Sequence, residues 1–334
     1  MKRSIGCCAA DGAKRLVVGF YGTIGIVFAL VAIGYGLSAA RWVKRETGDG
    51  LSDFVIVVAI PVLLFRTLAM ADFGGADPVP LWIAYFTGVA VTWVLATVTL
   101  RRGFGRDARG GVVAGLSAAF ANLVLLGIPM ILALFGQEGF AILSLLLAVH
   151  LPIMMATSVI LYEIAQRRDG VQTGAVSAGA VVGRFLRGMA SNPIVIGILL
   201  GVAWRFTGWT LPIFAADLVD RLAGVAGTVA LIALGMSLDK FGIARNVGQG
   251  AATAAIKLFV MPSVVTLVAL LIDLEPAMAH VAIVGAAMPT GVNPYLIAAR
   301  LGTGEALASN TMVVATAIAP LSLLGWLWVA QALF

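Results

Sequence analysis

The chain has 334 residues, of which 61% are hydrophobic and only 11% are charged. Soluble domains carry about 25% charged residues, so this composition excludes a water-soluble fold. A formal net charge of +6 would suggest nucleic-acid binding in a soluble protein, but here the basic residues form short clusters between apolar runs. Such clusters set the orientation of membrane proteins, so we expect no nucleic-acid partner. The two cysteines, Cys7 and Cys8, are adjacent, which excludes a disulfide framework or a cysteine-based metal site.

Apolar runs long enough to cross a hydrocarbon layer of about 30 Å recur along the chain. Residues 1–15 precede the first run and are expected to form a disordered or dispensable extension. The ten predicted spans are residues 16–40, 51–71, 79–100, 111–135, 139–162, 189–206, 211–237, 250–273, 277–299 and 307–332. We therefore predict an all-α integral membrane protein with membrane lipid as its solvent.

The basic residues predict the orientation of these spans. The odd-numbered connections hold fourteen lysines and arginines, whereas the even-numbered connections hold two. Because Lys and Arg are retained in the cytoplasm, the odd-numbered connections are predicted to be cytoplasmic and both termini to lie outside. The cytoplasmic linker 163–188 then separates two five-span halves, 16–162 and 189–332. An odd number of spans per half is the condition for an inverted repeat.

Two spans are interrupted near their middle. The fourth contains Asn122 followed by a Gly-Ile-Pro sequence, and the ninth contains the sequence Pro-Thr-Gly-Val-Asn-Pro. Proline lacks a backbone N–H, and glycine loosens the backbone, so the helical ladder is expected to open at both places. The resulting half-helices would direct their amino ends into the membrane centre and attract an anion such as a carboxylate. The predicted binding residues are Asn122, Gly127, Pro129, Pro289, Thr290, Gly291, Asn293 and Pro294. The alternative is that both places are simple proline kinks without a binding role. Two interruptions in corresponding places of the two halves favour the binding site.

The chain resembles the auxin efflux carrier family, within the wider group of bile acid and sodium symporters. The resemblance covers about residues 16–332. It rests on the motifs around Asn122 and Asn293 and on these further residues: Leu51, Pro61, Leu63, Leu64, Phe65, Ser191, Asn192, Pro193, Leu234, Gly235, Met236, Ser237, Leu238, Lys257, Leu258 and Pro262. The long cytoplasmic loop of the plant carriers is reduced here to a short linker.

The resemblance implies a scaffold domain and a mobile domain whose broken spans four and nine cross. It also implies that Asn122 and Asn293 contact the substrate, that transport is elevator-like, and that the protein is a homodimer. Bacterial relatives of this kind take malonate, malate or similar carboxylates, so we expect a secondary transporter of a small organic anion. The alternatives are an auxin-like or indole-carboxylate efflux carrier and a sodium-coupled, bile-acid-like symporter.

Three basic side chains inside spans are candidate charge partners for the substrate. Lys257 lies in span eight, where it either neutralises a carboxylate or extends to the cytoplasmic surface. Arg66 is more consistent with reaching the outer surface. His150 is expected to be packed and hydrogen-bonded, with proton coupling as the alternative. Because no acidic residue lies in the central part of a predicted span, the sequence does not decide between H⁺ and Na⁺ as the coupling ion.

Other functional classes lack their signatures. The sequence has no HExxH motif, no facing aspartates and no Asp-rich diphosphate site, so we expect no enzyme activity, no cofactor and no metal site. A channel is disfavoured because discontinuous helices in two halves are typical of alternating access.

Overall fold

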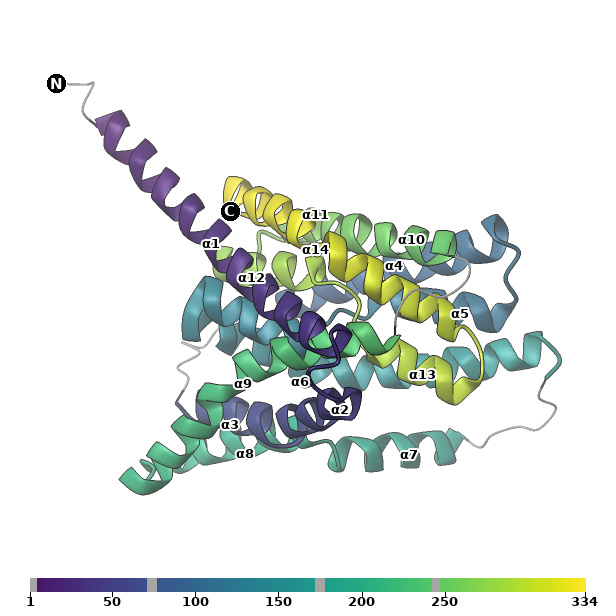
Figure 1. Ribbon diagram of the computed structural model, residues 1–334, viewed down its shortest axis with the longest axis horizontal. Coiled ribbons are helices and arrows are strands. Elements are labelled where there is room, and N and C mark those ends of the chain that lie inside the picture. Colours follow the sequence, from purple (N-terminus) through teal and green to yellow (C-terminus); the bar gives the residue numbers. More distant parts are fainter. Residues whose placement is uncertain (1–4, 71–76, 172–177, 242–246) are drawn as a thin grey trace.

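The computed structural model describes residues 5–70, 77–171, 178–241 and 247–334. The regular elements of these residues are helices, numbered in chain order in Figure 1. They are α1 (Ile5–Ala39), α2 (Arg45–Phe54), η1 (Val55–Ala59), α3 (Ile60–Met70), α4 (Val79–Gly103), α5 (Ala108–Ala119), η2 (Leu123–Gly127), α6 (Ile128–Arg168), α7 (Ala178–Ala190), α8 (Pro193–Thr207), α9 (Ile213–Phe241), α10 (Val247–Ala255), η3 (Ile256–Val260), α11 (Met261–Leu271), α12 (Pro276–Ala287), α13 (Asn293–Leu301) and α14 (Glu305–Leu333).

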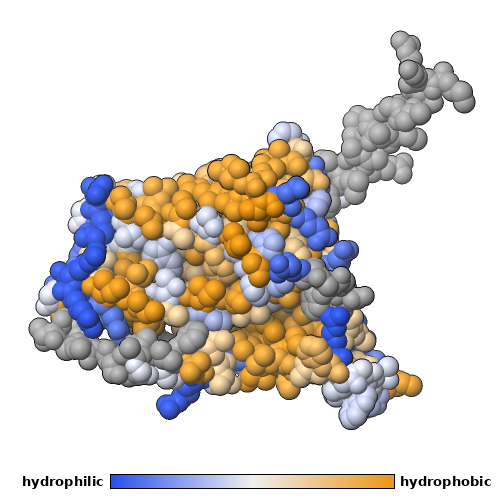
Figure 2. Space-filling model, turned by 180° about the vertical axis from the view of Figure 1, so that it is seen from behind, coloured by the Kyte–Doolittle hydropathy of each residue, from blue (hydrophilic) through white to orange (hydrophobic). Residues whose placement is uncertain are grey.

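Seven helical ranges among the described residues are long and apolar enough to cross a membrane. They are Tyr21–Ala39, Glu46–Met70, Val79–Gly103, Leu123–Arg168, Ile213–Phe241, Val247–Leu271 and Glu305–Leu333, and two shorter apolar helices are α8 and α12. Figure 2 shows hydrophobic side chains over most of one face, with strongly hydrophilic residues along its left and right margins. The chain is therefore a multi-pass membrane protein, which confirms the predicted class.

Proline explains three short stretches of wider helix. The π-helical segments η1, η2 and η3 each end two residues before a proline, namely Pro61, Pro129 and Pro262. Proline cannot donate the backbone bond that would close an α-helical turn, and its ring crowds the carbonyl four residues earlier. A locally widened turn relieves this crowding without ending the helix. Two of the three continue a long helix, whereas the one before Pro129 follows a true break.

Two of the predicted spans are interrupted by non-helical residues. α5 ends at Ala119 and η2 begins at Leu123, so residues 120–122 separate them. α12 ends at Ala287 and α13 begins at Asn293, so residues 288–292 form a second break. The helix after the first break changes direction again at Gly136, where φ is 64°. This left-handed conformation suits glycine because it has no Cβ.

Glycines allow close packing between helices that are distant in sequence. α1 packs against α9, where Gly34 faces the backbone of Ile232 and Gly235 faces that of Val31. α3 packs against α8, where a Cβ on Gly201 would lie 2.8 Å from the carbonyl oxygen of Phe65. α3 and α8 lie on one side of the bundle and α4, α10 and α11 on the other (Figure 1). Small residues permit this close backbone approach in membranes.

The amino terminus of α5 is fixed by two carboxylates. Asp107 accepts a hydrogen bond from the N–H of Gly110 at 2.8 Å, which caps the helix. Asp169, just after α6, accepts from the N–H groups of Ala108 and Arg109 at 3.0 Å each and from the Arg109 guanidinium at 3.1 Å. Burial by itself would raise the pKa of Asp169, but these hydrogen bonds and the neighbouring guanidinium outweigh it and lower the pKa. The broken helix is thereby attached to the end of α6.

Two sequence predictions about chain segments need comment. Residues 5–15, predicted to be disordered or dispensable, are the beginning of α1, and residues 1–4 lie outside the described residues. Whether they are dispensable stays a prediction. The linker 163–188 includes the end of α6 and most of α7, and its residues 172–177 lie outside the described residues.

Candidate functional site

The two helix breaks meet and pair with each other. Ala121 and Thr290 form an isolated antiparallel bridge. The N–H of Asn122 donates to the carbonyl of Pro289 at 2.8 Å, and the N–H of Gly291 donates to the carbonyl of Phe120 at 3.4 Å. Unpaired backbone groups are costly in a membrane, so each break supplies partners that the other needs.

Thr290 and Gly291 explain why the second break has this sequence. Thr290 is fully buried, and its hydroxyl donates to the carbonyl of Ser117 at 2.7 Å, near the end of α5. A Cβ on Gly291 would lie 3.4 Å from both Cα and Cβ of Asn122. A methyl group at Gly291 would therefore just touch Asn122, which shows how closely the two breaks approach.

Asn122 ends the first break and starts the helix that follows. Its side-chain oxygen accepts from the N–H of Leu125 at 3.2 Å, and its carbonyl accepts from the N–H of Gly127 at 2.9 Å. The residue is 5% exposed, and its side-chain nitrogen has no hydrogen-bond partner. Asn122 therefore caps one helix with its oxygen and keeps an amide donor available.

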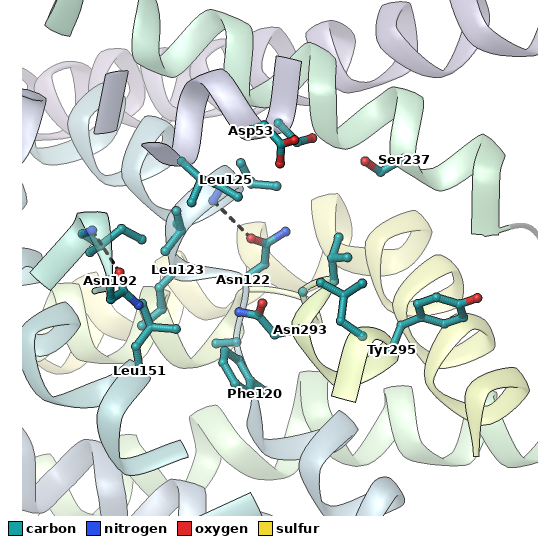
Figure 3. A pocket seen from close by; sticks show the side chains of 18 of the residues that line it. Asp53, Phe120, Asn122, Leu123, Leu125, Leu151, Asn192, Ser237, Asn293 and Tyr295 are labelled. Atoms are coloured by element: carbon teal, nitrogen blue, oxygen red, sulfur yellow. Dashed lines mark hydrogen bonds between the residues drawn. The ribbon is translucent and has the colours of Figure 1, made fainter. Parts of the chain in front are cut away.

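Figure 3 shows Asn122 and Asn293 near each other in the centre of a cavity. Asn293 is the first residue of α13, and Pro294 occupies that helix's first turn, whereas Pro129 follows the η2 turn and does not begin its helical segment. Proline suits this position because the first turn has no intrahelical acceptor for its missing N–H. The amino ends of α13 and of the η2–α6 segment thus both begin at the paired breaks, where helix dipoles favour negative charge.

The cavity has a volume of about 790 Å³. Four of the predicted site residues line it: Asn122, His150, Gly291 and Asn293. Gly127, Pro129, Pro289, Thr290 and Pro294 are not among its lining residues, although Pro289 and Thr290 bond to the opposite break. The prediction of which of these residues bind substrate stays a prediction.

Other helices complete the wall with residues that sequence reasoning did not select as site residues. They include Asp53, Asn192, Ser237, Lys240 and Tyr295. Asn192 caps α8 through a 2.9 Å hydrogen bond from the N–H of Ile194. Lys240 pairs with Asp49 at 2.7 Å. Asn192 and Ser237 lie within motifs that carry the family resemblance, and that resemblance could have identified them as site residues. No such sequence feature pointed to the acidic residues of the wall.

His150 is packed but not hydrogen-bonded. It is 1% exposed, and neither ring nitrogen has a partner. Its ring lies 5.1 Å from that of Phe120, 5.6 Å from that of Tyr85 and 6.4 Å from that of Phe86, between ring centroids. The predicted hydrogen bond to His150 was therefore wrong, because the residues around it are mostly aromatic.

The other two candidate charge partners do not line the cavity. Lys257 is fully buried, and its amino group donates to the carbonyl of Ala286 at 2.9 Å and contacts the sulfur of Met261 at 2.8 Å. It therefore does not extend to the surface; it binds the end of α12, two residues before the break. Arg66 forms an ion pair with Asp220. Within the described residues, no group of three or more His, Cys, Asp or Glu side chains could hold a metal ion.

A multi-pass helical bundle whose two broken helices pair beside a cavity is typical of membrane transport proteins. Residues 20–327 match the family described as Membrane transport protein, and the chain belongs to this family, the auxin efflux carrier group. The predicted resemblance is thus confirmed.

Several relatives align with most of the chain at low sequence identity. An "Uncharacterized transporter" of Methanothermobacter thermautotrophicus is 25% identical over 91% of this chain and 96% of its own length. A "Putative malonate transporter" of Rhizobium meliloti is 24% identical over 91% of this chain and 93% of its own. "Auxin efflux carrier component 8" of Arabidopsis thaliana is 24% identical over 86% of this chain and 92% of its own. The names of these relatives refer to different substrates, or to none.

Proposed function

We propose that this protein is a secondary active transporter of a small organic anion, of the size and charge of malonate or malate. The observation that carries the proposal is the pair of helix amino ends that begin at the joined breaks, with the unpartnered amide nitrogen of Asn122 between them. Helix amino ends and amide donors complement a carboxylate. Asn293 and the backbone around Gly291 complete the proposed contacts with Asn122.

The substrate class is supported by the cavity and by one relative. A volume of about 790 Å³ admits a di- or monocarboxylate with bound water. The relative named for malonate covers nearly the whole chain. Phe120 and Tyr295 also line the cavity, and an auxin carrier is among the relatives, which keeps an indole carboxylate as the second candidate. A sodium-coupled, bile-acid-like symporter is a third candidate, and a channel is disfavoured because both breaks are closed by mutual hydrogen bonds.

The proposed topology has ten spans in two inverted five-span repeats, in the cytoplasmic membrane, with both termini outside. In this arrangement Asp49, Gly188 and Lys240, which line the cavity, lie toward the cytoplasmic ends of their helices. The cavity would then open inward, and the anion would cross by an elevator-like movement of the domain that holds the two breaks. We further propose that the scaffold forms a homodimer.

Counterflow in proteoliposomes tests the transport proposal. Vesicles that contain the purified protein and unlabelled malonate should accumulate labelled external malonate transiently, and malate, acetate and indole-3-acetate serve as competitors. Exchange stimulated by internal substrate indicates a carrier, because a channel gives no such stimulation. The absence of stimulated exchange with every one of these carboxylates would overturn the proposal.

A further inference from the structure

His150 lies on the wall of the cavity that contains Asn122. It belongs to the second part of α6, past the change of direction at Gly136, and Pro152 follows it in the same helix. Its ring neighbour Phe120 belongs to the first helix break, as does Asn122, which lines the same cavity. The imidazole is therefore part of the proposed anion site although it comes from a different helical segment.

The two ring nitrogens have no partner, although the ring is almost completely buried. A neutral imidazole carries one donor and one acceptor, and a buried polar atom without a partner costs about 1–3 kcal/mol. A purely structural histidine would be expected to have at least one hydrogen bond. An unpartnered imidazole and the unpartnered amide of Asn122 in one cavity both point to a ligand.

Few titratable groups surround the ring. Tyr85 of α4 faces it, and its hydroxyl also lacks a partner. Lys257 of η3 is near enough to act on it electrostatically, but its amino group is bonded to the carbonyl of Ala286. Asp53 and the paired Asp49 and Lys240 line other parts of the cavity. His150 is thus a base on the cavity wall that is surrounded by aromatic rings. A charged imidazolium is poorly stabilised in such surroundings unless an anion lies beside it.

We propose that His150 takes up one proton when the anion binds and releases it with the anion, so that transport is proton-coupled. The proposal rests on the proposed function and names its coupling ion. A proton from water in the cavity adds to a ring nitrogen, and the imidazolium pairs with a carboxylate of the substrate. When the anion leaves on the other side, the imidazole is neutral again and the proton enters the water there. One proton crosses with each anion.

The sign of the pH dependence follows from this step. Because the complex holds one proton more than the empty protein, the anion binds more tightly as pH falls. An inward gradient of one pH unit should drive accumulation of a monoanion up to about tenfold at zero membrane potential.

The test compares His150→Gln and His150→Asn with His280→Gln in the same proteoliposomes. His280 is stacked on Phe135 and does not line the cavity, so it is the matched histidine control. With malonate as the probe, counterflow without a gradient should be unchanged in His280→Gln and slower in both His150 variants, which lack the proposed contact with the substrate. Stimulation of uptake by an acidic exterior should be lost in both His150 variants and kept in His280→Gln.

The outcomes separate this proposal from the proposed function. Counterflow that persists with unchanged stimulation in both His150 variants overturns the coupling role and leaves the transporter intact. Proton uptake on malonate binding that is unchanged in His150→Gln also overturns it. Absence of counterflow in the unsubstituted protein overturns the proposed function. Proton uptake on malonate binding, measured by calorimetry in two buffers of different ionisation enthalpy, should fall from about one to zero in His150→Gln.

Discussion

Asn122 should contribute to stability and to anion binding through different atoms. Its side-chain oxygen caps the helix that follows the first break, whereas its side-chain nitrogen has no partner. Replacing an Asn cap by Ala costs about 1 kcal/mol of stability. Loss of a hydrogen bond to a charged ligand costs about 1.5–3 kcal/mol of binding, which is roughly a 10- to 150-fold weaker affinity.

Asn192 offers a matched control for this separation. It also caps a helix with its side-chain oxygen and lines the same cavity, but it lies away from the two breaks (Figure 3). We expect Asn122→Ala and Asn192→Ala to lower the melting temperature in detergent by similar amounts. We expect only Asn122→Ala to weaken malonate binding by more than about tenfold.

Isothermal calorimetry and thermal unfolding on the same preparations measure both effects. Asn122→Asp is a useful third variant, because it keeps the accepting oxygen while it removes the donor. The reasoning fails if the two alanine variants change the malonate Kd equally, or if Asn122→Asp binds malonate as well as the unsubstituted protein.

Three further predictions concern the surrounding framework. Thr290→Val should lower stability by about 1–3 kcal/mol, because the Ser117 carbonyl loses its donor, and Thr290→Ser should restore it; thermal unfolding measures both. Gly235→Leu should separate α9 from the α1 backbone and abolish a monodisperse peak in size-exclusion chromatography, whereas Gly224→Leu, with open space around it, should not. Because the pKa of Asp169 is lower in the folded protein, its carboxylate stabilises the fold above about pH 4, the pKa in the unfolded chain. This stability is lost as pH falls through the pKa in the folded protein. Asp169→Asn should therefore remove the corresponding decrease from a plot of melting temperature against pH.

The second break could be predicted because its chemistry is local: residues 288–292 include Pro289 and Gly291, which remove a donor and relax the backbone. The first break was expected around Gly127 and Pro129 but lies at residues 120–122, which include neither proline nor glycine, and the helix runs on through Pro129 after a widened turn. The cavity wall could not be predicted in the same way. Asp53, Ser237 and Lys240 come from helices far apart in sequence, and only the packing of those helices brings them to one wall.

Packing also decides between alternatives that the sequence leaves open. The spacing of Gly197 and Gly201 arises often by chance in a glycine-rich chain, but both glycines face the backbone of α3. From the sequence alone, Lys257 could equally have reached the surface or remained inside. In the fold its amino group bonds to the carbonyl of Ala286 at the buried end of α12, which keeps it inside. The hydrogen bond expected at His150 is absent because aromatic rings from α4 and from the first break occupy the space around it.

Several carbonyls at and beside the breaks are already bonded, which bears on the sign of the ligand. The carbonyls of Ser117, Phe120 and Pro289 accept from the opposite break, and that of Ala286 accepts from Lys257. The amide nitrogen of Asn122 has no acceptor, and the first N–H groups of α13 lack intrahelical partners, as at every helix start. A cation would need free carbonyl oxygens, as half-helix carboxyl ends supply in sodium-coupled carriers. The carbonyls named here are already bonded, which supports the proposed anion as the ligand.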